Sequence, residues 1–266
     1  RHMRIETLLK AKPKHDKESL RQIQTDVFSL GAQRMLPWLH QAKPTHALGA
    51  AAMQKLAAFT GEMRATDAAP LIYAAWAREL TRAVLADEMG GDEYYLSQVG
   101  RRDFRDALEG VLERNDAWWC DDKTTPATET CAEMINRSLD RALEELQKSQ
   151  GADLARWKWG AVHLASSEHR PFSKVKALAP WFELRVATGG DTYTVNVGRY
   201  NLKGAEPYLN EHAASLRAIY DLKDPANSSV MHSSGQSGLV LSPDYRSFVD
   251  SWATVRSLPL WSGGER

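Results

Sequence analysis

Two glycine-rich segments of the sequence hold residue types that could bind phosphate or perform acyl transfer. They are Gly189-Gly190-Asp191 and the stretch 233–238, which contains Ser237. A loop that cradles phosphate needs the spacing G-x-x-x-x-G-K-[ST] or G-x-G-x-x-G, and neither segment has it. Ser237 lies in Gly-Gln-Ser-Gly-Leu, which differs from the G-x-S-x-G turn that exposes a hydrolase nucleophile. Both segments are therefore interpreted as turns.

The eight histidines are spread along the chain and form no metal-binding pattern. Neither H-E-x-x-H nor H-x₃-H occurs, so we predict no metal site. His163 is the histidine nearest to a motif, because it follows Trp157-Lys158-Trp159-Gly160 closely. We predict that it is a hydrogen-bonded structural residue packed near Trp159.

Nine tryptophans are a high count for this length. Trp118 with Trp119, and Trp157 with Trp159, could form a platform on which sugar or nucleic acid stacks. No basic stripe accompanies them, so packing in a core or an interface is the favoured interpretation. The platform remains as the alternative function: a non-catalytic, tryptophan-rich module that binds carbohydrate or protein.

The two cysteines, Cys120 and Cys131, bracket a polar stretch of the chain. Two thiolates are too few for a structural zinc site, which needs four ligands. They are either two unrelated buried thiols or a disulfide that ties a loop to the start of the next helix. A disulfide would add about 2–3 kcal/mol of stability and would place maturation in an oxidising compartment.

Charge and hydropathy exclude several classes of protein. Lys plus Arg and Asp plus Glu both number 34, so the formal net charge is zero. A balanced chain has no overall electrostatic attraction to nucleic acid or to anionic membranes, and neither partner is expected. No long apolar run occurs, which argues against a transmembrane helix. With 43% apolar residues, the 266-residue chain is predicted to be globular.

Apolar periodicity predicts helices through residues 1–150, and these elements must position any site. The expected helices span residues 16–32 with an extension past Pro37, then 45–59, 67–89, 102–114 and 125–150. After Gly151 we expect a hairpin over 182–197, strands at 215–221, 229–233 and 238–241, and a final helix from Pro243. This order predicts an α+β fold. Its two parts are a helical part, 1–150, and an antiparallel strand-rich part, 151–266.

Five short motifs resemble, in the same order, those of the penicillin amidase (penicillin acylase) family. The family patterns are I-Q-x-D-x-x-S, W-x-W-G-x-x-H, G-G-D-x-x-T-V-N, S-x-R-x-I-x-D and G-Q-S-G-x-x-x-S-x-x-Y. In this chain they occupy residues 23–29, 157–163, 189–196, 215–221 and 235–245. One match alone is weak, but five in order over nearly the whole chain resemble the C-terminal part of the family's β chain.

The resemblance implies an N-terminal nucleophile hydrolase with an αββα sandwich, made from a precursor that cleaves itself. In this family the N-terminal Ser of the β chain is the nucleophile and, through its α-amino group, the general base. It forms an acyl-enzyme from an N-acyl amide, while a backbone N–H and an Asn side chain stabilise the oxyanion. Members act on β-lactam antibiotics or N-acyl-homoserine lactones, in the periplasm or outside the cell.

The chain departs from the family at its start, because its first residue is Arg1 and not Ser, Thr or Cys. We therefore expect the nucleophile, the oxyanion donors and any calcium ligands on companion chains of the same precursor, and no cofactor in this chain. A start at Arg1 also implies an additional cut just upstream, with at least three polypeptides per enzyme. The resemblance places Arg1 near the active site, where its guanidinium gives electrostatic support. The alternative is an ordinary surface arginine.

Overall fold

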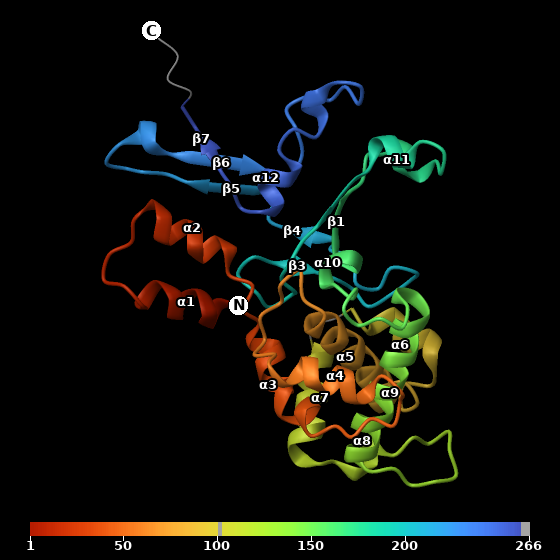
Figure 1. Ribbon diagram of the computed structural model, residues 1–266. Coiled ribbons are helices and arrows are strands. Elements are labelled where there is room, and N and C mark those ends of the chain that lie inside the picture. The colour runs from red at the N-terminus through yellow and green to blue at the C-terminus, as the bar shows by residue number, and fades with distance from the viewer. Residues whose placement is uncertain (101–102, 262–266) are drawn as a thin grey trace.

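The computed structural model describes residues 1–100 and 103–261, and Figure 1 shows their arrangement. Helices make up the first part of the chain, and in the described residues every named strand lies after residue 163. The strands form small antiparallel sheets, so the predicted mixture of helices and antiparallel strands is confirmed. None of the described helices combines the length and the apolar character needed to cross a membrane.

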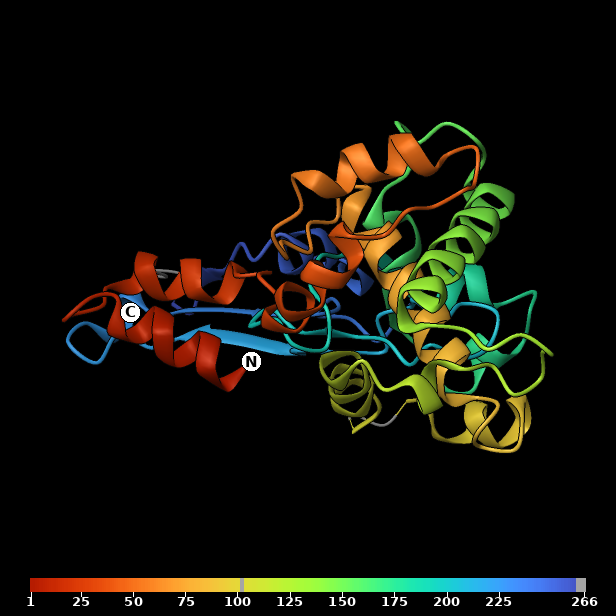
Figure 2. The ribbon, with the colours of Figure 1, turned by 90° about the horizontal axis from the view of Figure 1, so that it is seen from below.

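The first two helices, α1 (His2–Lys10) and α2 (Lys17–Thr25), form a hairpin that projects from the helical body (Figure 2). The sequence starts α2 with a capping box, which satisfies two backbone N–H groups. Ser19 N donates to Asp16 Oδ1 at 2.8 Å, and Asp16 N donates to Ser19 Oγ at 2.9 Å. The C-terminal half of α2 contacts β5 (Leu216–Ile219), so the hairpin is held against a sheet from the other end of the chain.

Seven further helices form the body. They are α3 (Leu30–His40), α4 (Gly49–Ala57), α5 (Ala69–Leu85), α6 (Asp92–Gln98), α7 (Asp103–Arg114), α8 (Ala117–Cys120) and α9 (Cys131–Gln150). The long helices α5 and α9 pack together at its centre, where Trp76 Nε1 donates to Ile135 O at 3.3 Å. The same core includes the buried residues Trp157, Trp159 and Tyr208. Because the core extends past residue 150, the division of the chain at that point stays a prediction.

A disulfide joins Cys120, the last residue of α8, to Cys131, the first residue of α9. Both residues are buried, and their Cα atoms are 4.9 Å apart. Of the two interpretations of the cysteines, the structure therefore favours the disulfide. It closes the polar loop 121–130 onto the base of α9.

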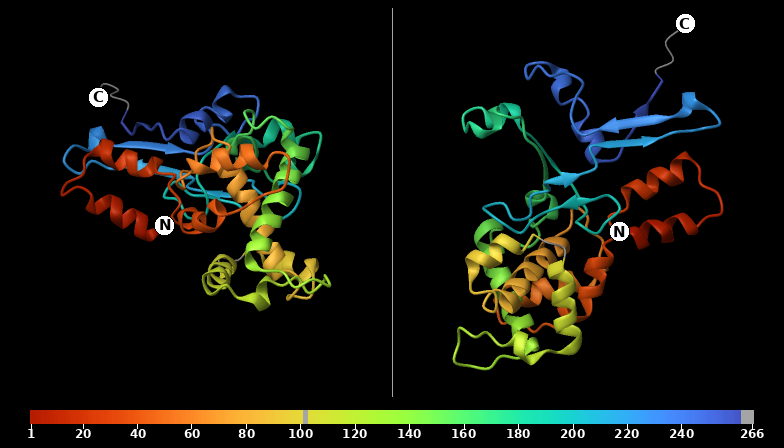
Figure 3. Two further views of the ribbon diagram at one scale, coloured as in Figure 1. Left: turned by 60° about the horizontal axis from the view of Figure 1, so that its bottom comes forward. Right: turned by 180° about the vertical axis from the view of Figure 1, so that it is seen from behind.

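The second part of the chain consists of short elements. They are α10 (Trp159–Val162), β1 (Leu164–Ser167), α11 (Ala179–Phe182), β2 (Leu184–Ala187), β3 (Gly198–Arg199), β4 (His212–Ala213), β5, β6 (Ser229–His232), α12 (Val249–Ala253) and β7 (Leu258–Pro259). Three antiparallel sheets result: β1–β2, β3–β4 and β5–β6–β7. Figure 3 shows that they lie on one side of the helical body, with two arms at α11 and before α12 extending outward.

The single helix expected over residues 16–32 is wrong, because the chain forms α2 and α3 there. Asp26 is extended, with ψ at 117°, and Phe28 forms a β-bridge with Glu62. Ser29 then starts a second axis, since its Oγ accepts a hydrogen bond from Ala32 N at 3.1 Å. The apolar spacing continues across this break, which is why periodicity alone did not reveal it. The extension past Pro37 is confirmed, because Pro37 lies inside α3.

The hairpin expected over residues 182–197 is also wrong. Its first half forms β2, but β2 pairs with β1 in the register Leu164↔Ala187, and residues 192–197 form a loop. The strand expected at 238–241 is a turn as well. The helix expected from Pro243 is a 3₁₀ turn followed by α12, and β7 comes after it. The strands expected at 215–221 and 229–233 are confirmed as β5 and β6.

Candidate functional site

The loop from Gly189 to Gly198 is the place where most of the motif segments meet, and Asp191 is its centre. Asp191 is 1% exposed. Ser29 Oγ donates to Asp191 Oδ2 at 2.6 Å, and the N–H groups of Tyr193 and Thr194 donate to Oδ1 at 2.7 and 3.0 Å. Burial raises the pKa of Asp191, although these donors and nearby Arg105 act in the opposite direction. The carboxylate thereby fixes the loop to the start of α3.

The α1–α2 hairpin is attached to this loop through Asp26. Asp26 O accepts a hydrogen bond from Asn196 N at 2.9 Å. Its carboxylate forms an ion pair with Arg4, whose Nη2 lies 2.6 Å from Asp26 Oδ2 and whose guanidinium also covers the Phe28 ring at 4.6 Å. Planar guanidinium suits such paired and stacked contacts. Arg4 thus holds α1 against the first motif segment, and Asp26 O joins that segment to the third.

The loop is attached to the C-terminal sheet through Arg217 of β5. Arg217 Nη2 donates to Asn196 Oδ1 at 2.5 Å, and Nη1 donates to Trp252 O at 2.8 Å. The guanidinium also lies 4.6 Å from the centre of the Trp252 ring. Burial lowers the pKa of Arg217 to about 10, so the side chain keeps its charge at neutral pH. Its role in the structure is to hold Asn196 against β5 and α12.

The tryptophan motif contacts the loop through Trp159. Trp159 Nε1 donates to Gly190 O at 3.0 Å, and the His163 ring stacks on Trp159 with 4.3 Å between the ring centres. His163 is 0% exposed, and its Nδ1 lies 2.7 Å from Tyr208 O. A carbonyl can only accept, so Nδ1 carries the proton. The prediction that His163 is a hydrogen-bonded structural residue packed near Trp159 is confirmed.

Gly198 lies so close to His163 that a side chain at this position would overlap His163 Nε2 and crowd Asn210 Nδ2. We expect Gly198→Ala to lower the stability by about 1–3 kcal/mol, as overpacking of a close-packed interior does. The midpoint of thermal unfolding of the purified protein measures this. Gly238→Ala is the matched control, because a Cβ there meets nothing within 4 Å. Equal midpoints for the two variants would contradict the packing described.

Arg1 lies at the edge of this site. It is exposed and directly precedes α1. Its main-chain nitrogen is near the charges of Asp191, Arg105 and Arg34. The start of α1 is therefore close to the loop where the motifs meet, while the electrostatic role of the Arg1 side chain stays a prediction.

Three serine hydroxyls in the described part of the chain lie beside an acid or a base. Ser166 Oγ of β1 donates to Glu183 Oε1 at 2.7 Å, and the other two hydroxyls cap helices. Ser29 Oγ contacts Asp191, and Ser19 Oγ lies 3.2 Å from His15 Nδ1. Each of these two hydroxyls also accepts a hydrogen bond from a backbone N–H at a helix start, and both serines are buried. Neither capping serine is available as a nucleophile. Within residues 1–100 and 103–261, no cluster of three His, Cys, Asp or Glu could hold a metal ion.

Other candidates from the sequence are distributed over the fold. Ser237 Oγ accepts a hydrogen bond from Leu239 N at 3.1 Å, which agrees with a turn residue. Trp157 and Trp159 are 1% and 0% exposed, so they form part of the core and no stacking platform. Trp118 is 55% exposed and packs edge-to-face against Trp119, away from the Asp191 loop.

Arg105 of α7 is a residue of the site that sequence analysis missed. Its guanidinium lies 4.1 Å from the centre of the Tyr193 ring, and its Nη1 lies 2.6 Å from Glu109 Oε1. An Arg and a Glu four residues apart on one helix were the available signal. That spacing indicates an ion pair, but it does not indicate which loop lies opposite the helix.

Several curated proteins are similar in sequence to this chain. Acyl-homoserine lactone acylase QuiP of Pseudomonas syringae pv. tomato is 28% identical over 217 residues, which cover 79% of this chain and 26% of that protein. QuiP of Pseudomonas aeruginosa is 25% identical over 284 residues, which cover 95% of this chain and 33% of that protein. The chain thus spans about a quarter to a third of the length of these curated relatives.

A solved structure shows the same fold. Penicillin G acylase from Alcaligenes faecalis aligns with 97% of this chain and 48% of its own, with a TM-score of 0.50 and 15% sequence identity. The model of the penicillin amidase family matches residues 1–265. Because that match extends over nearly every residue, the chain belongs to the penicillin amidase family.

Proposed function

We propose that this chain is the C-terminal part of an enzyme that hydrolyses N-acyl amides, with the nucleophilic Ser on a companion chain of the same precursor. The family match over residues 1–265 is the observation that carries the proposal. The chain's own residues support it, because the motifs converge on a network that positions a loop and leaves nucleophilic chemistry to another part of the protein. We propose further that the whole protein is an αββα sandwich.

An uncovered sheet face supports the presence of companion chains. In the sheet β5–β6–β7, Met231 belongs to a core with Trp252 of α12. Side chains at alternating positions point away from that core, and among them Leu216, Tyr220 and Leu258 are 56%, 62% and 45% exposed. Such apolar surface on a sheet is favourably covered by a further layer. We assign that layer to companion chains.

The substrate class comes from the relatives. The curated relatives are acyl-homoserine lactone acylases and the structural neighbour is a penicillin G acylase, so both N-acyl-homoserine lactones and β-lactams with an acyl side chain are candidate substrates. We place the enzyme in the periplasm or outside the cell. The Cys120–Cys131 disulfide supports this, because disulfides persist in oxidising compartments.

The test is hydrolysis by the full precursor, with Arg1→Ala as the informative variant. We expect the wild type to release free acid from an N-acyl-homoserine lactone or from penicillin G. We expect Arg1→Ala to lower kcat about tenfold without changing processing or thermal stability, because a positive charge near developing negative charge would be lost.

His2→Ala is the control, since His2 is the exposed residue next to Arg1, at the start of α1. Wild-type kcat/KM in Arg1→Ala would remove Arg1 from the active site. Absence of hydrolysis of both substrates by correctly processed wild-type protein would overturn the proposed function.

A further inference from the structure

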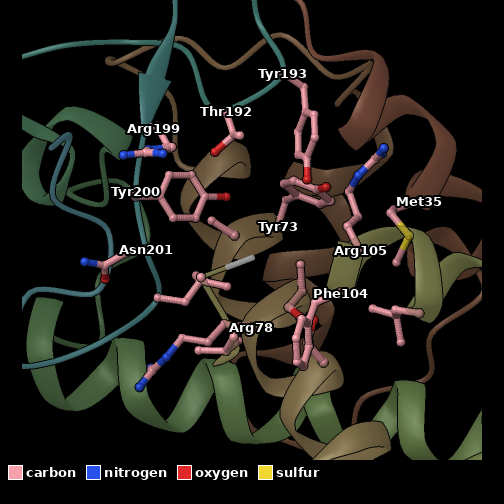
Figure 4. A pocket seen from close by; sticks show the side chains of 17 residues that line it. Met35, Tyr73, Arg78, Phe104, Arg105, Thr192, Tyr193, Arg199, Tyr200 and Asn201 are labelled. Carbon is pink, nitrogen blue, oxygen red and sulfur yellow. The ribbon is translucent and has the colours of Figure 1, made fainter. Parts of the chain in front are cut away.

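A small cavity lies between α3, α5, α7 and the segment 192–202. Its volume is about 100 Å³. Figure 4 shows that the hydroxyl groups of Tyr73, Tyr193 and Tyr200 gather on one side of it, while apolar side chains such as Phe104 form the other. The cavity therefore has a polar end and an apolar end, an arrangement typical of sites for small molecules.

The hydroxyls at the polar end are available to a ligand. Tyr73 is 4% exposed, and its hydroxyl, like that of Tyr200, makes no hydrogen bond to another described residue. Burial raises the pKa of both phenols well above the usual value, so both keep their protons. A hydroxyl that faces a cavity without a protein partner can donate to a ligand there. These two donors therefore favour a ligand that accepts hydrogen bonds.

The wall at Tyr193 is held in place from both sides. The Arg105 guanidinium lies 4.1 Å from the centre of the ring, and Gly31 of α3 lies against the ring so closely that a Cβ there would contact it. Tyr193 also follows Asp191, which holds its backbone N–H at 2.7 Å. The polar end is thus preformed, which lowers the cost of binding.

The charges around the cavity favour a neutral ligand. Three of the described lining residues are arginines: Arg105 is paired with Glu109 and Arg78 with Glu145, each at 2.6 Å, while Arg199 is exposed to solvent. Burial raises the pKa of Tyr73 and Tyr200 most, and the negative charge of Asp191 raises it further. A ligand carboxylate beside these hydroxyls would be repelled by the same charge. A cation would find no acidic partner on the wall, because none of the described lining residues is Asp or Glu.

We propose that this cavity binds a small neutral molecule that presents a carbonyl oxygen to Tyr73 and Tyr200. A cavity of about 150 Å³ admits benzene, so about 100 Å³ suits a five-membered ring. Resting on the proposed function, we assign the ligand as the lactone ring of an N-acyl-homoserine lactone. Its carbonyl oxygen accepts from the phenols, and its methylene groups lie toward Phe104.

Calorimetric titration of the processed enzyme, together with its companion chains, tests this assignment with γ-butyrolactone as the probe. We expect saturable binding that is weakened three- to tenfold in Tyr73→Phe and in Tyr200→Phe, because each variant loses one hydrogen bond and keeps the ring. Tyr220→Phe is the control, since Tyr220 is 62% exposed just after β5 and does not line the cavity. The ring-opened anion, 4-hydroxybutyrate, is expected not to bind.

Steady-state kinetics add a readout that depends on the substrate. In Tyr200→Phe we expect a raised KM for an N-acyl-homoserine lactone and an unchanged KM for the anilide of the same acyl group. Lactone binding that is equal in the wild type and in both phenol variants would overturn the cavity assignment, as would preferential binding of the anion. Lactone binding by an enzyme that hydrolyses neither substrate would support the cavity and overturn the proposed function.

Discussion

Replacing Asp191 by alanine is expected to have the largest effect of any single substitution in the loop, because it leaves three buried donors without an acceptor. Ser29 Oγ, Tyr193 N and Thr194 N all donate to this carboxylate, which is 1% exposed. Removing one partner from a buried, charged network costs about 3–5 kcal/mol. That is a large share of the stability of an ordinary domain. We expect little correctly folded protein from this variant.

Asp191→Asn removes the charge but keeps a side chain that forms hydrogen bonds, so it distinguishes the two contributions to stability. The remaining carbonyl oxygen can still accept from Tyr193 N and Thr194 N, while the new amide faces the Ser29 hydroxyl. We expect this variant to fold with a lower thermal midpoint than the wild type and a higher one than Asp191→Ala. Asp250→Ala is the control, because Asp250 is an exposed carboxylate. An Asp191→Ala variant as stable as this control would contradict the network.

The sequence predicted the motifs of this network but not their contacts. Asp26, Ser29, Asp191, Asn196 and Arg217 all lie within the five motifs, and the structure brings them together through direct bonds. Their order along the chain indicates a family, since order is preserved when the fold is. It does not indicate which residue meets which, because those contacts join residues as far apart as Asp26 and Asn196.

The errors in the predicted elements have local causes. Residues 192–197 have the composition of a strand, yet the Thr194 hydroxyl bonds within the loop, donating to Asn196 O at 2.7 Å. Side-chain bonds of this kind compete with pairing between strands. β1 was missed because Leu-Ala-Ser-Ser carries no β-branched or aromatic residue, and only its pairing with β2 orders it. Capped starts such as Asp16 were predicted correctly, because their signal is local.

His163 leads to a second large effect, a loss of stability in mild acid. The ring is fully buried between Trp159 and the backbone of Tyr208, and burial lowers its pKa to about 4 from the usual value near 6.5. Its Nε2 has no hydrogen-bond partner among the described residues, so a proton added there would be a buried, unpaired charge. The aromatic neighbours Tyr200 and Tyr208 do not change charge in this range, because burial raises their pKa values.

The sign follows from proton binding by the two states. Between about pH 6.5 and pH 4 the unfolded chain protonates this histidine and the folded chain does not, so the unfolded state binds more protons and stability falls as the pH falls. The resulting loss in the free energy of unfolding is close to zero at pH 7.5 and about 2 kcal/mol at pH 5. This loss of stability is reversible, because the imidazole loses its proton again when the pH is raised.

We therefore expect His163→Asn to be less stable than the wild type at pH 7.5, because the stacked ring is lost. As the pH falls to 5, we expect this difference in stability to become smaller. Asn can replace the donor at Nδ1 but does not titrate, so the acid-dependent part of the wild-type loss disappears from the variant. Urea denaturation midpoints of the wild type and the variant, measured across this range, provide the comparison. His2→Asn, which changes an exposed histidine, is expected to follow the wild type at every pH. If the difference in stability between His163→Asn and the wild type did not change with pH, His163 would protonate equally in the folded and unfolded states. That result would contradict the neutral, buried imidazole that the Tyr208 contact and the Trp159 stack require.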